Sequence, residues 1–156
     1  MGEERYVWSA EGRDAEELSR LKLLEGVVDP VTIRHLEVTG VTMGWKCLDV
    51  GAGAGSIAQW LSQRAGPTGR VVATDINTKF LDRLSAPNLE NRRHDILNDD
   101  LEEGVYDLVH CRNVLHHVAE PEKAVRRMAD ALRPGGWLVL EEPDHSSVLS
   151  VDVTNP

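Results

Sequence analysis

A glycine-rich turn follows a short apolar segment in the first third of the chain. The residues numbered 47–56 run Cys-Leu-Asp-Val-Gly-Ala-Gly-Ala-Gly-Ser. Glycine lets the backbone turn sharply, and it lets a ligand approach the main chain without side-chain atoms between them. The free N–H groups of a helix that begins after such a turn favour an anionic or carboxylate group. The stretch therefore predicts a strand, a ligand-binding turn and a helix that packs on a sheet.

Strand-like and helix-like segments alternate after this turn. Apolar or β-branched runs predict strands over 46–50, 70–74, 106–110 and 137–140. A further short strand is expected over the polar residues 91–93, before Asp95. Apolar residues at helical spacing predict helices over 56–64, 78–84 and 120–132. We expect the turn cluster Pro134-Gly135-Gly136 to end the last of these helices. This alternation is typical of a doubly wound, Rossmann-like α/β fold with a mostly parallel sheet of about five strands.

The N-terminal segment predicts helices rather than strands. Apolar residues recur three and four positions apart, at Leu18, Leu21, Leu24 and Val28. A second short helix is expected after Asp29, which can cap it, because Pro30 suits the first helical position. We expect a single domain over 1–156, with a helical cap (1–44), a core (45–142) and a candidate flexible tail (143–156).

Charge and composition exclude several classes of protein. The formal net charge is −9, which argues against a nucleic-acid binder, because such proteins neutralise phosphates with a basic face. No apolar run is long enough to cross a membrane. The first residues have no signal-peptide pattern, and two cysteines are too few for a disulfide framework. These features predict a cytoplasmic location and two unpaired thiols, Cys47 and Cys111.

An acidic residue directly follows the second predicted strand. Asp75 lies 20 residues beyond Gly55, where an acid can accept hydrogen bonds from the two hydroxyls of a ribose. The alternative is that Asp75 caps the next helix. The dinucleotide fingerprint G-x-G-x-x-G would need a third glycine at the position of Ser56. An NAD-type oxidoreductase therefore stays an alternative that the glycine spacing disfavours.

Five motifs in register resemble those of the class I S-adenosylmethionine (SAM) dependent methyltransferases. The stretch 49–55 resembles the family's D-x-G-x-G-x-G motif, and Asp75 matches the acid after its second strand. The stretches 94–96, 106–117 and 132–141 resemble the segments at its third, fourth and fifth strands. The match runs from about Trp45 to Glu142 and is most similar to the small-molecule branch that includes quinone-biosynthesis enzymes.

The resemblance implies a SAM site and a role for each matching residue. The glycine turn would pack against the methionine part of SAM near Asp49, and Asp75 would hold the ribose. Ile76, Asp95 and Ile96 would surround the adenine. Cys111 or Arg112, just past the fourth strand, would offer backbone carbonyls to the methionine amino group, and Tyr6 and Arg20 would close the pocket over its carboxylate. The implied cofactor-binding set is Asp49, Gly51, Ala52, Gly53, Gly55, Asp75, Ile76, Asp95, Ile96, Cys111, Arg112, Tyr6 and Arg20.

Two adjacent histidines after the fourth strand are the candidate general bases. His116 and His117 would lie near the methyl group, and a histidine titrates near neutral pH. The alternative is a structural pair, because transfer can proceed by positioning alone. Adjacent side chains are expected to point apart, so we expect no metal site. The predicted activity is methyl transfer from SAM to a small molecule, leaving S-adenosylhomocysteine (SAH).

The chain departs from the family in its C-terminal part. Members of the class have two further strands beside the fifth, whereas this sequence ends soon after its fifth strand. An uncovered apolar edge at 137–140 favours association, so a homo-oligomer that covers this edge is a candidate assembly. A SAM-binding module without catalysis is therefore a further alternative to the enzyme.

Overall fold

The computed structural model describes residues 14–144, which contain one five-stranded parallel sheet. Its strands lie in the order β3-β2-β1-β4-β5, with bounds β1 (Lys46–Val50), β2 (Arg70–Asp75), β3 (Leu89–Arg93), β4 (Tyr106–Arg112) and β5 (Leu132–Glu141). The helices are α1 (Asp14–Val38), α2 (Ser56–Ala65) and α3 (Pro121–Asp130), with single 3₁₀ turns η1 (Leu81–Arg83) and η2 (Leu115–His117). The predicted Rossmann-like fold class is confirmed, and the first four strands and α2 lie within two residues of their predicted bounds.

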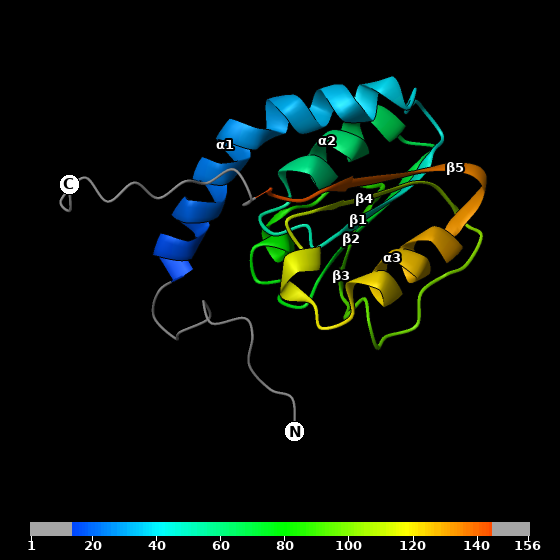
Figure 1. The fold of residues 1–156 in the computed structure, drawn as a ribbon. Coiled ribbons are helices and arrows are strands. Elements are labelled where there is room, and N and C mark those ends of the chain that lie inside the picture. The colour runs from blue at the N-terminus through cyan, green and yellow to red at the C-terminus, as the bar shows by residue number, and fades with distance from the viewer. Residues whose placement is uncertain (1–13, 145–156) are drawn as a thin grey trace, which may run out of the picture.

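The helices cover both faces of the sheet. Figure 1 shows α1 and α2 on one face and α3 on the other. Alternate residues of each strand supply the two faces. In β1, Cys47 belongs to the core beneath α2, whereas Leu48 and Val50 belong to the core that holds Met128 of α3. Both cores consist mainly of buried aliphatic side chains. Because a shift of one residue would turn these side chains to the other face of the sheet, their burial fixes the strand register.

The strand order indicates where on the sheet a ligand binds. The chain adds β2 and β3 on one side of β1 and then crosses to add β4 and β5 on the other. In an open α/β sheet, ligands bind outside the carboxyl ends of the strands at such a reversal. The glycine turn after β1 and the segment after β4 therefore meet at one edge.

The N-terminal segment is one helix, so the predicted division into two helices is wrong. Asp29 and Pro30 lie inside α1, and Asp29 is not a cap because its side chain accepts a hydrogen bond from Arg112. Pro30 lacks the N–H that would bond the carbonyl of Gly26, so the helix bends rather than stops. Figure 1 shows this bend in α1.

The helix predicted over 78–84 is also wrong, because the structure has only the single turn η1 there. The side-chain amide of Asn91 in β3 donates to the carbonyls of Leu81 and Leu84, at 2.7 and 3.0 Å. A helix over 78–84 would leave its last four carbonyls without a helical partner, so Asn91 satisfies two carbonyls of this segment from a neighbouring strand. Leu84 is extended, and Pro87 follows closely and favours an extended residue before it. The segment therefore keeps only the single turn η1.

The last helix ends earlier, and the last strand begins earlier, than predicted. The carbonyl of Asp130 accepts a hydrogen bond from Gly104, and Leu132 is already paired with Tyr106. The cluster Pro134-Gly135-Gly136 does not separate helix from strand but forms an irregularity within β5. A Cβ on Gly136 would lie 2.9 Å from the Tyr106 carbonyl oxygen, so the close approach of the backbones requires glycine there.

The outer edge of β5 has no neighbouring strand within residues 14–144. Trp137 and Leu140 on this strand are 48% and 36% exposed. The expected homo-oligomer that covers this edge stays a prediction, as does the division into cap, core and tail. Cys47 and Cys111 are buried free thiols, as expected. Over the described part of the chain, no helix is long and apolar enough to cross a membrane.

Candidate functional site

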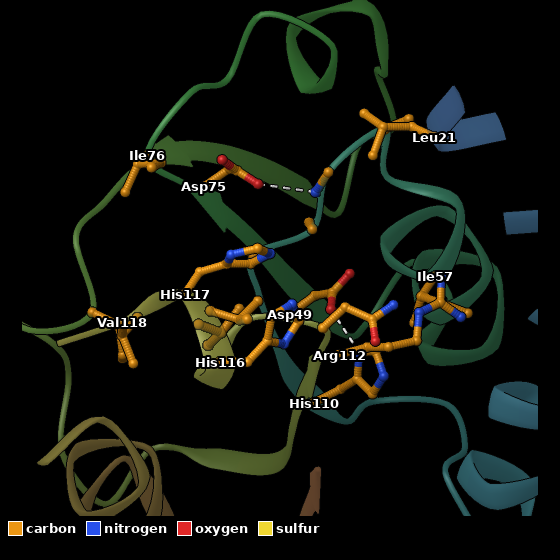
Figure 2. A pocket seen from close by; sticks show the side chains of 18 of the residues that line it. Leu21, Asp49, Ile57, Asp75, Ile76, His110, Arg112, His116, His117 and Val118 are labelled. Carbon is orange, nitrogen blue, oxygen red and sulfur yellow. Dashed lines mark hydrogen bonds and ion pairs between the residues drawn. The ribbon is translucent and has the colours of Figure 1, made fainter. Parts of the chain in front are cut away.

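A cleft of about 1450 Å³ lies at the carboxyl ends of the strands, beneath the first half of α1. Figure 2 shows its side chains converging from the two sides of the glycine turn. The predicted residues that line it are Arg20, Asp49, Gly51, Ala52, Gly53, Asp75, Ile76, Asp95, Ile96, Arg112, His116 and His117. Gly55 and Cys111 do not line it, and Tyr6 lies outside the described residues.

The glycine turn has the backbone conformation that only glycine adopts without strain. Gly51, Gly53 and Gly55 have φ angles of 67°, 59° and 86°. A Cβ on Gly51 would lie 2.2 Å from a methyl carbon of Val114, so the turn packs directly on the loop after β4. A Cβ on Gly55 would instead meet Leu84 at 2.2 Å. Gly55 is buried, whereas the backbone of the other two glycines lines the cleft.

Asp75 spans the space between the end of β2 and the glycine turn. Its Oδ2 accepts a hydrogen bond from the N–H of Gly53 at 3.0 Å, and its Oδ1 accepts one from Asn77 at 3.0 Å. Burial raises the pKa of this carboxyl above its usual value, although these backbone donors oppose the change. An ionised carboxylate has about four acceptor positions, so two stay available for hydroxyl groups.

Asp49 lies at the floor of the cleft with one oxygen paired and one unpaired. Its Oδ1 is 2.7 Å from Nδ1 of His110, a buried residue of β4. Its Oδ2 is buried and has no hydrogen-bond partner within residues 14–144. A buried carboxylate oxygen without a partner is unfavourable. A positively charged or hydrogen-donating group in the cleft would satisfy this oxygen.

The residues predicted to surround the adenine lie along the ends of β2 and β3. Ile76 is 47% exposed at the mouth of the cleft, and Ile96 is buried in its wall. The two carboxylate oxygens of Asp95 accept hydrogen bonds from the N–H of Leu97 and the side-chain amide of Asn98, each at 2.8 Å. Burial opposes ionisation of Asp95, but these donors prevail and lower its pKa.

Cys111 and Arg112 are the last two residues of β4, not residues past its end as predicted. The strand is longer than expected because it pairs with β5 as far as Arg112 and Glu141. Cys111 points into the core beneath α3, and burial raises the pKa of its thiol. Arg112 points the other way and donates to Asp29 at 2.9 Å and to Thr32 at 2.8 Å. These bonds attach α1 to the sheet.

The first half of α1 forms the wall of the cleft opposite the sheet. The side chain of Arg20 lines the cleft and donates twice to Glu17, at 2.8 and 2.6 Å. Leu21 and Leu24, two of the apolar residues at helical spacing, also line the cleft. Glu25 accepts a hydrogen bond from the N–H of Ser56, the first residue of α2, at 3.3 Å. Burial raises the pKa of Glu25.

The two candidate bases lie on η2, on the side of the cleft formed by the loop after β4. Nδ1 of His116 is 2.6 Å from Oε2 of Glu142, and the other oxygen of Glu142 accepts the N–H groups of Val114 and Leu115. Glu142 therefore orients the His116 ring through its Nδ1 atom. Burial and the neighbouring His116 lower the pKa of His117, which keeps that ring neutral at neutral pH.

The expectation that the two rings point apart is wrong. The ring centroids of His116 and His117 are 3.9 Å apart with a tilt of 46°. Both residues lie in a single 3₁₀ turn rather than a regular helix or strand, and Glu142 turns the first ring toward the second. No group of three or more metal-binding side chains occurs in the described part of the chain.

Three acidic residues of the site and one histidine were missed by reasoning from the sequence. Glu25 lies in no motif, and Glu141 and Glu142 end the matched stretch without a predicted role. All three reach the site through contacts between distant segments. One feature of the sequence could have indicated His110. This residue and Asp49 are polar residues near the carboxyl ends of two predicted strands, and the carboxyl ends of neighbouring parallel strands meet at one edge of the sheet.

The cleft fits the cofactor that the resemblance implies. The backbone at Gly51 and Gly53 lines the cleft, and the oxygens of Asp49 and Asp75 are acceptors at the floor and the rim. SAM carries a sulfonium and an ammonium group, both cationic, and a ribose diol. A cleft with acceptors at those positions suits such a molecule.

Comparisons with known proteins agree with this geometry. A family model described as a methyltransferase domain matches residues 48–140. The ubiquinone/menaquinone biosynthesis C-methyltransferase UbiE of Pseudomonas putida (strain GB-1) is 34% identical over 115 residues, which are 69% of this chain and 45% of that protein. An uncharacterized 37.1 kDa protein in a transposon of Streptomyces fradiae is 34% identical over 122 residues, covering 75% of this chain and 35% of that protein.

A solved structure, the SAM-dependent methyltransferase from Aquifex aeolicus, superposes with a TM-score of 0.65 and 25% identity, covering 78% of this chain and 70% of that one. This chain spans less than half the length of the two curated relatives above. The family model nevertheless covers more than half of this chain, including the glycine turn, Asp75 and β4. The chain belongs to the class I S-adenosylmethionine-dependent methyltransferase family.

Proposed function

We propose that this protein transfers the methyl group of SAM to a small-molecule acceptor. One observation carries the proposal: the glycine turn, Asp75 and the two candidate bases line the same cleft. SAM supplies an electrophilic methyl group on a sulfonium sulfur. The turn and Asp75 would hold the cofactor, and the opposite side at η2 would receive the acceptor.

The size of the cleft supports a small acceptor beside the cofactor. Pockets for one ligand have volumes of roughly 300–1,000 Å³, whereas this cleft has about 1450 Å³. The relative from Pseudomonas putida is a C-methyltransferase of quinone biosynthesis, which is a small-molecule reaction. A net charge of −9 disfavours a nucleic-acid acceptor. The cytoplasmic location and any homo-oligomer stay predictions.

His116 and His117 are the proposed proton acceptors. A base assists when the acceptor atom carries a proton that must leave as the methyl group arrives. Glu142 holds His116 by its Nδ1 atom, in the manner of a carboxylate that orients a catalytic imidazole. His117 is kept neutral by burial and by its neighbour, so its ring can accept a proton at neutral pH.

Calorimetric titration of the 156-residue chain with SAM, SAH and NAD tests the cofactor assignment. We expect SAM and SAH to bind with micromolar affinity and NAD to give no heat of binding. Binding of NAD in place of SAM would support the oxidoreductase instead and refute the proposal.

Transfer of a labelled methyl group to a panel of phenols, quinols and amines tests the reaction. We expect turnover with at least one class of acceptor, and a loss of roughly 10²–10⁴-fold in kcat for the variant that removes the base. The matched variants are His116→Ala and His117→Ala, with Lys123→Ala on α3 as the control outside the cleft. SAM binding without turnover of any acceptor would favour a non-catalytic module.

A further inference from the structure

A line of four polar side chains connects the floor of the cleft to α1. Asp49 and His110 are register partners on β1 and β4, with Oδ1 and Nδ1 2.7 Å apart and side chains only 3% and 2% exposed. Nε2 of His110 lies 3.4 Å from Oε2 of Glu141, near the end of β5. Oε1 of Glu141 lies 2.7 Å from Nδ1 of His35 on α1. The line therefore runs across three neighbouring strands and onto the helix that covers them.

The chemistry of the line requires a charged imidazole at its centre. Both ring nitrogens of His110 face a carboxylate oxygen. A neutral imidazole has one N–H and one lone pair, so one nitrogen would oppose an acceptor. The doubly protonated ring donates in both directions. Burial acts against this charge, but the two carboxylates prevail and raise the pKa of His110.

The geometry leaves one oxygen of Asp49 directed away from this line. His110 holds Oδ1, so the carboxyl group cannot rotate without losing a charged hydrogen bond. Figure 2 shows the dashed contact to His110 from one oxygen and the other oxygen pointing away from that ring. Oδ2 is buried in the lining of the cleft without a partner in the described part of the chain. Asp49, His110 and Glu141 together keep a net charge of about −1, which suits a cation at Oδ2.

We infer that His110 is a positioning residue, which holds Asp49 so that its Oδ2 receives the ammonium group of the methionine end of SAM. Glu141 and His35 hold the ring of His110 from its other side. The inference rests on the proposed SAM site. A histidine of β4, held by residues of β5 and α1, thus controls how the methionine end of SAM is bound. Asp75 acts on the ribose.

Two ligands separate this role from general support of the fold. SAH carries the amino acid end, and 5′-methylthioadenosine lacks it but keeps the adenine and ribose. Variants His110→Gln and Glu141→Gln are titrated with both ligands by calorimetry. We expect His110→Gln to raise the Kd for SAH by about tenfold or more and the Kd for methylthioadenosine by less than about threefold. Glu141→Gln should also raise the Kd for SAH relative to the Kd for methylthioadenosine, but by a smaller factor than His110→Gln.

A third ligand and a core variant complete the design. Decarboxylated SAH keeps the amine and lacks the carboxyl group, so it should follow SAH. Val71→Ala, in the core beneath α2, should lower thermal stability without changing the ratio of the two affinities. Should His110→Gln fail to fold, Glu141→Gln decides, because Glu141 is partly exposed. Equal losses for SAH and methylthioadenosine, or no loss for either, would overturn the inference alone. Wild-type protein that binds neither ligand would overturn the proposed function as well.

Discussion

Replacement of Asp75 by alanine removes the carboxylate proposed to hold the ribose of SAM. In the protein alone, this carboxylate accepts one hydrogen bond from Gly53 and one from Asn77, each at 3.0 Å. Two of its roughly four acceptor positions are therefore used, and the other two match the two hydroxyls of a ribose. Alanine at this position leaves both hydroxyls without an acceptor from the protein.

The size of the effect follows from the charge and burial of this carboxylate. A hydrogen bond to a charged group contributes about 1.5–3 kcal/mol. The free ligand keeps its bonds to water, so we expect a net loss of about 1–3 kcal/mol for the diol as a whole. That loss raises the Kd for SAH by roughly 5- to 150-fold at 25 °C. The free energy of unfolding should change less than the binding free energy. Burial of the charged Asp75 is unfavourable, as the raised pKa of this carboxyl indicates, and alanine removes that cost.

The assay is calorimetric titration of wild type and Asp75→Ala with SAH and with its 2′,3′-dideoxy analogue. We expect the variant to bind SAH more weakly but to bind the analogue as wild type does, since the analogue lacks both hydroxyls. The matched control is Asp82→Ala, an exposed acid on η1 outside the cleft. An unchanged Kd for SAH, or an equal loss for the analogue, would remove Asp75 from the ribose site.

Three further perturbations test other contacts of the site. Gly51→Ala should lower the free energy of unfolding by roughly 2–5 kcal/mol in urea denaturation, because a φ of 67° disfavours alanine and its Cβ would meet Val114 at 2.2 Å; an unchanged midpoint would contradict this. Arg112→Leu should cost about 1.5–3 kcal/mol and speed hydrogen exchange throughout α1, because it leaves Asp29 without its cation; unchanged exchange would show that α1 is held by other contacts. Burial opposes ionisation of Glu141, but bonds from histidines and a threonine prevail and lower its pKa from 4.5 to about 2. A lowered carboxyl pKa stabilises the fold above its unfolded value, so stability should fall as the pH drops from about 4.5 to 2. Glu141→Gln should flatten that part of the denaturation profile, and an unchanged profile would argue against the pairing.

Local sequence signals predicted the sheet and the turn because those elements depend on nearby residues. The strands other than β3 contain short apolar runs, and β1 and β2 bury nearly every residue. The glycine turn needs positive φ angles, which only its own residues can supply. Asp75 was predictable for the same reason, since its place follows directly from the end of β2.

Distant contacts account for the elements that the sequence did not predict. Asn91 of β3 donates to the carbonyls of Leu81 and Leu84 and attaches this segment to the sheet as a single turn, and that contact cannot be seen in the 78–84 segment itself. The bent but unbroken α1 depends on Arg112, which lies more than 80 residues further along the chain and binds Asp29 and Thr32. A proline signal predicts a break, but the bonds from β4 hold the chain on both sides of Pro30 in one helix.

The two ends of the proposed cofactor site therefore differ in what holds them. The ribose end depends on Asp75 and Gly53, two residues fixed by adjacent strand and turn geometry. The methionine end depends on Asp49, whose free oxygen is set by a histidine on another strand. That histidine is in turn held by Glu141, the last residue of β5, on the edge of the sheet that has no neighbouring strand within residues 14–144. A change in how that edge is covered would thus reach the methionine end through Glu141 and leave the ribose end as it is.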